Sequence, residues 1–189
     1  MSNNRTTDFD ILIEHDLDIR ARIIYVQSDI DDALCAKFIK LLKYLDKTSG
    51  DIQIVLNSGG GCVTSGFAMH DAIKACNNPV TVKVYGRAMS AATVILQAGD
   101  LRIATRYTRF MIHRGETEVV GDFNNVKKLM KENEDMDKIL SDIYFNRMKE
   151  GNPLFKRAEL NKMMDVDFYF SAEKALELGL IDEIEGEED

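Results

Sequence analysis

Strand-like and helix-like segments alternate along the first 112 residues, and this alternation constrains the fold more than any other feature. Short apolar or alternating runs predict strands at residues 22–27, 51–56, 79–85, 101–104 and 108–112. Helical spacing predicts helices over residues 64–76 and 89–98, and over a segment that Ser28 or Asp29 can cap and that ends near Lys47. Strands separated by helices usually pair in parallel through right-handed crossovers. The sequence therefore predicts an α/β fold.

A long amphipathic helix is predicted over residues 122–150, where apolar residues recur every three or four positions. At 1.5 Å per residue it would span about 43 Å, whereas a domain of this length has a radius of gyration near ~16 Å. Two interpretations stay open. Either the helix projects from the body and another subunit covers its apolar stripe, or it breaks near Asn133 and both halves lie on the core.

The composition argues against several classes of protein. The 189 residues fit one domain, and 32 Asp and Glu against 24 Lys and Arg give a net charge of −8, which disfavours nucleic-acid binding. No apolar run approaches the roughly 20 residues of a membrane span, and the polar first twenty residues predict no secretory signal. Cys35, Cys62 and Cys76 are odd in number and widely spaced, so we expect no disulfide framework, no zinc site and a cytoplasmic location.

Glycines gather in the middle of the chain, and Gly59–Gly61 follow directly after a predicted strand. Consecutive glycines let backbone N–H groups converge into an anion-binding concavity, which can hold a phosphate or an oxyanion. The segment lacks the Lys-Ser/Thr of a Walker A loop. A tight strand-to-helix turn is the alternative interpretation.

Ser90 and His113 are the candidate nucleophile and base. Ser90 lies near the start of an apolar helix, where the N–H of Ala91 and the helix dipole are close, but a serine there can equally be an ordinary helix cap. His113 ends a predicted strand, where catalytic groups of parallel sheets often lie, although a half-buried structural histidine would look the same.

A carboxylate would be needed to orient the imidazole. Asp167 is the best local candidate because it lies within the apolar stretch 166–170, where a carboxylate tends to be partly buried and paired. Asp165 and Asp182 stay open as alternatives, since composition alone cannot choose among 32 acidic residues.

Four segments resemble, in order and in spacing, motifs of the proteolytic subunit of the ATP-dependent Clp protease. They are residues 57–66 (NSGGGCVTSG), 86–90 (GRAMS), 111–113 (MIH) and 167–172 (DFYFSA), and residues 175–182 (ALELGLID) resemble the ending that follows. The resemblance extends from about Arg22 to Ile184.

The resemblance implies a serine endopeptidase that works without metal or organic cofactor. Ser90 would be the nucleophile, His113 the general base and Asp167 the residue that orients it. The oxyanion hole would consist of backbone N–H groups of Ala91 and of Gly61 or Gly60. The substrates would be unfolded polypeptides delivered by an ATP-dependent AAA+ unfoldase.

The family also implies an architecture: a crotonase-like fold of stacked β/α repeats that assembles into two stacked rings, commonly heptameric. Residues 1–189 would form one peptidase domain. Within it, residues 1–20 form an atypical N-terminal segment, residues 122–150 a projecting handle helix that interleaves between rings, and residues 183–189 an acidic tail.

The sequence departs from the family pattern at several positions. Gly59 replaces a proline, Arg114-Gly115 replaces Gln-Pro, and the loop 115–121 lacks the usual Gly-Gly pair. The aromatic residues of the unfoldase-docking cleft are replaced by Gln53, Val55 and Ala75. Substrate preference and docking are therefore expected to differ from those of typical members.

Three other functions compete with this one. A phage head-maturation protease of the same superfamily would suit the run 90–96, and a catalytically inactive ring subunit would keep the architecture alone. A crotonase-type acyl-CoA enzyme would share the oxyanion geometry but would not need the serine–histidine pair.

Overall fold

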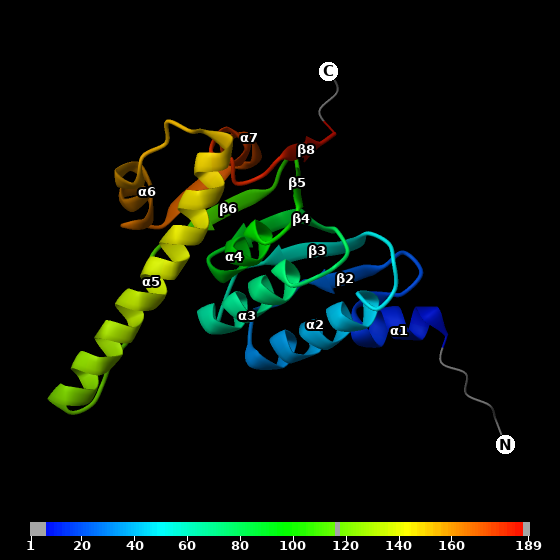
Figure 1. Ribbon diagram of the computed structural model, residues 1–189, viewed down its shortest axis with the longest axis horizontal. Coiled ribbons are helices and arrows are strands. Elements are labelled where there is room, and N and C mark those ends of the chain that lie inside the picture. The colour runs from blue at the N-terminus through cyan, green and yellow to red at the C-terminus, as the bar shows by residue number, and fades with distance from the viewer. Residues whose placement is uncertain (1–6, 116–117, 187–189) are drawn as a thin grey trace.

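A mixed β-sheet forms the centre of the computed structural model, which describes residues 7–115 and 118–186 (Figure 1). The strand order is β1-β2-β3-β4-β5-β8, with β6 beside β4 and β7 beside β6. The strands are β1 (Leu17–Asp18), β2 (Ile23–Val26), β3 (Ile52–Ser58), β4 (Val80–Met89), β5 (Leu101–Thr105), β6 (Arg109–Ile112), β7 (Phe168–Ser171) and β8 (Glu183–Glu185). Among these strands, β1 pairs antiparallel with β2 and β7 pairs antiparallel with β6, and the other pairs are parallel. The predicted α/β fold with parallel pairing is therefore confirmed.

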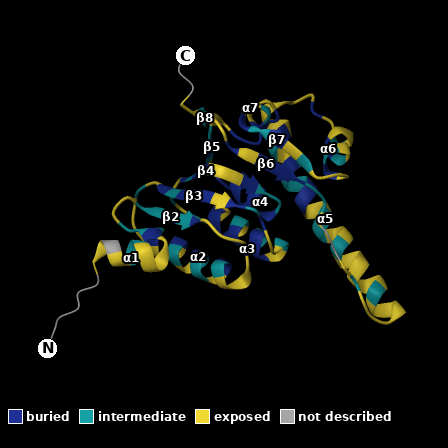
Figure 2. Cartoon of the chain, turned by 180° about the vertical axis from the view of Figure 1, so that it is seen from behind, coloured by how far each residue is buried: buried dark blue, intermediate teal, exposed yellow. Residues whose placement is uncertain are grey.

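Helices connect the strands and pack on the sheet. They are α1 (Asp8–His15), α2 (Asp32–Leu45), α3 (Val63–Lys74), α4 (Ala91–Gln97), α5 (Phe123–Gly151), α6 (Arg157–Met164) and α7 (Ala172–Glu177). Helices α2, α3 and α4 lie side by side in sequence order (Figure 1). Every residue of α4 is buried, and Figure 2 shows that α4 and the central strands make up the core. The helix that starts at Ser90 is therefore fixed on all sides.

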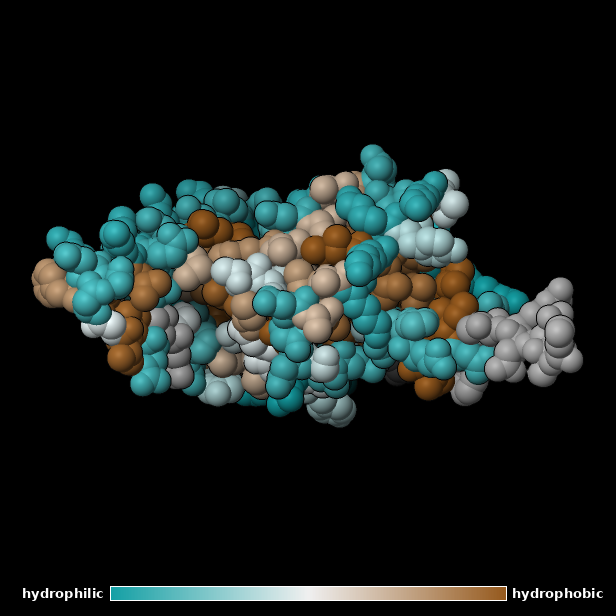
Figure 3. Space-filling model, turned by 90° about the horizontal axis from the view of Figure 1, so that it is seen from below, coloured by the Kyte–Doolittle hydropathy of each residue, from teal (hydrophilic) through white to brown (hydrophobic). Residues whose placement is uncertain are grey.

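Helix α5 is one unbroken helix of 29 residues, so of the two open interpretations the break near Asn133 is wrong. Asp122 caps it by accepting hydrogen bonds from the N–H groups of Asn124 and Asn125. Its second half packs on the body through Leu140, Ser141, Tyr144 and Met148. Its first half projects from the body (Figures 1 and 2), and apolar side chains there are exposed among hydrophilic ones (Figure 3). A long projecting helix is thus confirmed.

Several predicted boundaries shift. Helix α2 begins at Asp32 with Asp31 as its cap, not at Ser28 or Asp29, because Ile30 is held in a bridge with Gly61. Strand β4 continues past Gly86 to Met89, since its last residues pair with β6.

The ends of the chain contain elements that the sequence did not predict. Within the N-terminal segment, Thr7 forms a capping box for α1, and residues 1–6 lie outside the described residues. Within the acidic tail, β8 pairs with β5, and residues 187–189 lie outside the described residues. No helix in the described part of the chain is long and apolar enough to cross a membrane.

Candidate active site

Ser90 occupies the sharp turn between β4 and α4. Its backbone lies at φ 51° and ψ −126°, a conformation that L-residues rarely adopt and that costs about 1–3 kcal/mol. The turn is held because the Ser90 N–H donates to the Met111 carbonyl at 2.9 Å and the Thr93 N–H donates to the Ser90 carbonyl at 2.9 Å. The Ser90 hydroxyl makes no capping hydrogen bond to α4. Ser90 thus occupies the N-cap position of α4, but its hydroxyl does not cap the helix and is free for another partner.

That partner is His113, which follows the last residue of β6. Its Nε2 lies 2.9 Å from the Ser90 Oγ, and its Nδ1 lies 3.0 Å from Asp167 Oδ1. The register of the sheet explains the second contact. Ile112 of β6 pairs with Phe168 of antiparallel β7, so the next residue on one strand faces the preceding residue on the other. Three residues from distant parts of the sequence thus form one hydrogen-bonded chain.

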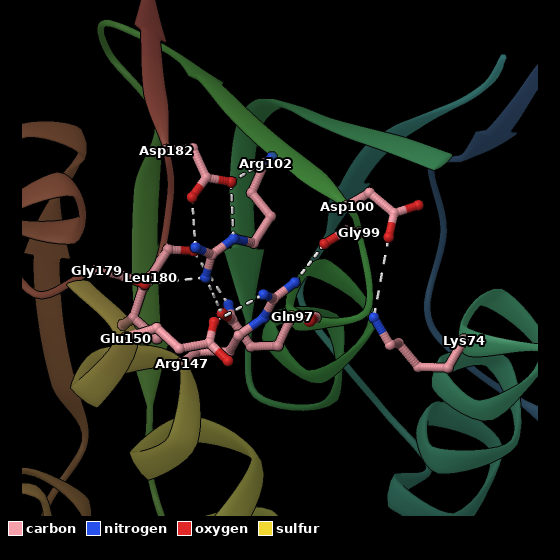
Figure 4. A network of polar contacts seen from close by, with 10 residues as sticks. All are labelled: Lys74, Gln97, Gly99, Asp100, Arg102, Arg147, Glu150, Gly179, Leu180 and Asp182. Carbon is pink, nitrogen blue, oxygen red and sulfur yellow. Dashed lines mark hydrogen bonds and ion pairs between the residues drawn. The ribbon is translucent and has the colours of Figure 1, made fainter. Parts of the chain in front are cut away.

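The other two carboxylates considered from the sequence lie elsewhere. Asp165 accepts a hydrogen bond from Arg114 at 3.0 Å. Asp182 accepts from Arg102 Nε at 2.9 Å in a network drawn in Figure 4. Burial favours a raised pKa for Asp182, but the hydrogen bonds and charge of Arg102 outweigh it and lower the pKa overall. Of the three candidates, only Asp167 contacts the imidazole.

The network of Figure 4 fixes the far end of α4. Arg102, which is 4% exposed, donates to Gln97 Oε1 at 2.8 Å and to the Gly179 carbonyl at 2.9 Å. Gln97 in turn donates to the Leu180 carbonyl at 3.2 Å. The helix whose first turn presents Ser90 is therefore anchored to the C-terminal segment.

The glycine loop packs directly against Ser90. Gly60 and Gly61 have φ values of 103° and 140°, which favour glycine. A Cβ on Gly60 would lie 2.6 Å from the Met89 carbonyl oxygen, and one on Gly61 would lie 2.3 Å from the Ile30 carbonyl oxygen. The loop can therefore approach Ser90 on one side and Ile30 on the other only because these residues lack side chains.

The hydrogen bonds of this loop distinguish the two glycines that the sequence left open. The N–H of Gly60 donates to Ser58 Oγ at 3.1 Å and is therefore engaged. The N–H groups of Gly61 and Ala91 have no acceptor among the residues that the structure describes. Of the two glycines considered, Gly61 rather than Gly60 is thus available as a donor.

A cavity of about 980 Å³ opens beside Ser90 and His113. Its far wall belongs to α5 and includes the side chains Met130, Met136 and Leu140. Such a volume is in the range of sites that enclose small ligands or short peptide segments. In the described part of the chain, no group of three or more His, Cys, Asp or Glu side chains is placed to hold a metal ion.

Tyr144 of α5 is a site-supporting residue that the sequence analysis missed. It is fully buried, and its hydroxyl lies 2.5 Å from Thr93 Oγ1 and 3.5 Å from the Ser90 carbonyl oxygen. Burial raises the pKa of Tyr144, so it stays a neutral donor. Its partners lie about fifty positions away in the sequence, and no local pattern announces such contacts.

A nucleophilic serine at a strand-to-helix turn, bonded to a histidine that is bonded in turn to a carboxylate, is the arrangement of a serine hydrolase. Comparison with known proteins identifies the family within this class of hydrolases. A family model described as Clp protease matches residues 12–188. The chain belongs to the Clp protease family and is therefore a serine-type peptidase, of the kind that serves as a Clp catalytic subunit.

Individual relatives agree with the family match. The chain is 32% identical over 169 residues to the ATP-dependent Clp protease proteolytic subunit of Chlorella vulgaris, with 87% of this chain and 82% of that protein covered. The same subunit of Deinococcus radiodurans is 31% identical over 170 residues, with 88% and 81% covered. A solved ClpP1 mutant from Listeria monocytogenes superposes with a TM-score of 0.76 at 28% identity, with 88% of this chain and 92% of that chain covered.

These relatives confirm the resemblance found in the sequence and the crotonase-like fold with its long helix. They do not favour the phage head-maturation protease, the inactive ring subunit or the acyl-CoA enzyme. The family also implies assembly into oligomeric rings and polypeptide substrates.

Proposed function

We propose that this chain cleaves peptide bonds with Ser90 as nucleophile, His113 as general base and Asp167 as the residue that orients the imidazole. The observation that carries the proposal is the continuous chain of hydrogen bonds, 2.9 Å from Ser90 to His113 and 3.0 Å from His113 to Asp167. A serine hydroxyl is a weak nucleophile until a base takes its proton, and this geometry supplies the base.

The reaction is acyl transfer in two halves. As Ser90 Oγ attacks the substrate carbonyl carbon, its proton passes to His113 Nε2, and Asp167 stabilises the resulting imidazolium through Nδ1–H. His113 then gives the proton to the leaving amine, and the C–N bond breaks. Water, deprotonated by His113, releases the acyl group from Ser90 and restores the hydroxyl.

The negative charge that develops on the carbonyl oxygen requires donors. The N–H groups of Gly61 and Ala91 have no acceptor among the described residues, and both residues line the cavity beside Ser90, so we assign the oxyanion hole to them. Gly60 contributes differently, because its missing side chain lets the loop close on Ser90. Loss of one such donor typically costs about 10²- to 10³-fold in kcat.

We further propose that the protein acts as a cytoplasmic assembly of two stacked seven-membered rings, in which α5 interleaves between rings. The exposed apolar residues of its projecting half support this arrangement, because a partner surface would cover them. An ATP-dependent unfoldase would deliver substrates to the chamber. Its docking contacts would differ from those of typical members, because Gln53, Val55 and Ala75 replace aromatic residues.

One experiment separates these parts of the proposal. The purified protein is imaged by negative-stain electron microscopy and assayed for cleavage of a short fluorogenic peptide and of unfolded casein. We expect stacked rings, peptide cleavage by the wild type, and intact rings without cleavage for Ser90→Ala. A monomeric protein would contradict the assembly, and undiminished cleavage by Ser90→Ala would contradict the mechanism.

A further inference from the structure

Arg114, the residue directly after His113, connects three elements at the edge of the catalytic cavity. Its backbone N–H donates to the carbonyl of Met164, the last residue of α6, at 2.9 Å. Its guanidinium donates to Asp165 at 3.0 Å and also to Asp137 of α5. Figure 1 shows α6 and α5 on the same side of β6.

The position of these contacts matters because the β6–β7 ladder ends just before the catalytic pair. Its last paired residues are Ile112 and Phe168, so His113 and Asp167 face each other beyond the ladder. The Asp167 side chain is 51% exposed, and water competes for its contact with the imidazole. Beyond this pair, the contacts of Arg114 with Met164 and Asp165 join the same two chain segments again. The His113–Asp167 pair therefore lies between the end of the β6–β7 ladder and the contacts of Arg114.

The contact with Asp137 connects the segment that follows β6 to α5. The Asp137 side chain is 25% exposed, and its Oδ1 is buried without a partner in the described part of the chain. Without Arg114 the whole carboxylate would be left nearly unpaired, which is unfavourable for a largely buried charge. The hydrogen bond to Asp165 and the charge of Asp137 outweigh burial and raise the pKa of Arg114, which therefore stays charged.

We propose that Arg114 is a positioning residue that holds the His113–Asp167 pair closed and couples it to the placement of α5. The proposal rests on the proposed function, since closing this pair matters only if the pair serves Ser90. The arginine replaces a glutamine of the family pattern, and a glutamine is shorter and uncharged. This chain therefore has an ionic link between the long helix and Asp165, through the residue that follows His113.

Arg157 provides a matched control. It also joins α6 to α5, through an ion pair with Asp142 at 2.7 Å and a hydrogen bond to Ser141 at 3.0 Å. It lies at the first residue of α6, whereas the contacts of Arg114 lie at the last turn. Loss of either arginine removes one link between the two helices, but only Arg114 adjoins His113.

The test compares steady-state cleavage of a fluorogenic peptide by the assembled variants. We expect Arg114→Gln to lower kcat about 10- to 100-fold, as misplacement of a catalytic group does, while KM rises less than about threefold. Arg114→Lys should recover part of the loss, because it keeps the charge but not the planar fork. Arg157→Gln should change kcat less than about twofold. An equal loss in Arg114→Gln and Arg157→Gln would overturn the proposal.

A double variant distinguishes positioning from general destabilisation. If Arg114 acts through the His113–Asp167 pair, Arg114→Gln should cost little further activity once Asp167→Ala has removed that pair. Losses that multiply in full would contradict the proposal. Asp165→Asn, which removes one partner only, should lower kcat about 3- to 10-fold and covers the case in which Arg114→Gln does not fold. Failure of the proposed function is separately visible, as undiminished cleavage by Ser90→Ala.

Discussion

Two histidine–aspartate pairs in this molecule have nearly the same local geometry and very different surroundings. His113 Nδ1 lies 3.0 Å from Asp167, and His70 Nδ1 lies 3.1 Å from Asp71. Both histidine side chains are 16% exposed. The pair at His70 is formed by neighbours in the sequence on α3, whereas the pair at His113 joins β6 to the residue before β7.

The difference lies in what the second nitrogen of each ring contacts. His113 Nε2 lies 2.9 Å from Ser90 Oγ, and His113 lines the same cavity as Gly61 and Ala91, whose N–H groups have no acceptor among the described residues. Among the described residues, the only side-chain hydrogen-bond partner of the His70 ring is Asp71, whose side chain is 83% exposed. A histidine bonded to a carboxylate is therefore not in itself a site. In the mechanism we propose, the serine and the oxyanion donors give the pair at His113 its chemical role.

The largest expected effect comes from replacing each histidine by alanine. His113→Ala should lower kcat for peptide cleavage about 10⁴- to 10⁶-fold, because nothing else can take the proton of Ser90. His70→Ala should change kcat less than about twofold. Steady-state assays of both variants, with ring assembly checked by native mass spectrometry, measure this contrast. Comparable losses would show that the pair at His113 is not special.

Replacing the aspartate of each pair should give the same contrast in kcat between the two pairs, with a smaller effect. Asp167→Asn should lower kcat about 10³- to 10⁴-fold, because the amide no longer stabilises the imidazolium and favours the wrong tautomer. Asp71→Asn should leave kcat within about twofold. A larger loss in Asp165→Asn than in Asp167→Asn, in the same assay, would show that Asp167 is not the carboxylate that orients the imidazole.

Substitutions in the glycine loop test the oxyanion hole, which has no counterpart at the pair at His70. Gly60→Ala should lower kcat about 10²-fold or more, because its Cβ would displace the turn at Ser90 and with it an oxyanion donor. Gly59→Ala should cost clearly less, since its Cβ would meet only the end of the Arg87 side chain, at 3.6 Å. Equal losses in the peptide assay would mean that loop closure on Ser90 is not what matters.

Asp182 extends the comparison to a carboxylate that pairs with Arg102, away from the His113–Asp167 pair. Its pKa is lowered in the folded chain, so its stabilising contribution is present above pH about 4 and is lost as the pH falls below that value. Asp182→Asn should lower the free energy of unfolding by about 2 kcal/mol at pH 7, because Arg102 loses its ionic partner. Urea unfolding at pH 7 and pH 3 measures this. An undiminished difference at pH 3 would contradict the assignment.

The sequence predicted those parts of the fold and site that local patterns encode. The apolar runs of β2 to β6 and the spacing along α5 are local, and so are the segments around Ser90 and His113. Strand β8 escaped prediction because it is three residues long and two of them are acidic. Its pairing with β5, rather than propensity, makes it a strand.

Contacts between distant residues could not be predicted. The sequence favoured Asp167 over Asp165 and Asp182, but the contact of Asp167 with His113 depends on the register of β6 against β7, which no local pattern contains. The engagement of Gly60 by Ser58 likewise depends on the loop conformation. The contacts of Arg114 could not be predicted either, because its side-chain partners lie 23, 47 and 51 positions further along the chain.

Labelling with a fluorophosphonate probe tests the central claim most directly, because such probes react with serines that a neighbouring base has activated. Mass spectrometry of the labelled, assembled protein identifies the modified residue. We predict a single adduct on Ser90, retained in His70→Ala and lost in His113→Ala. An adduct on another residue, or labelling of Ser90 that survives in His113→Ala, would contradict the account.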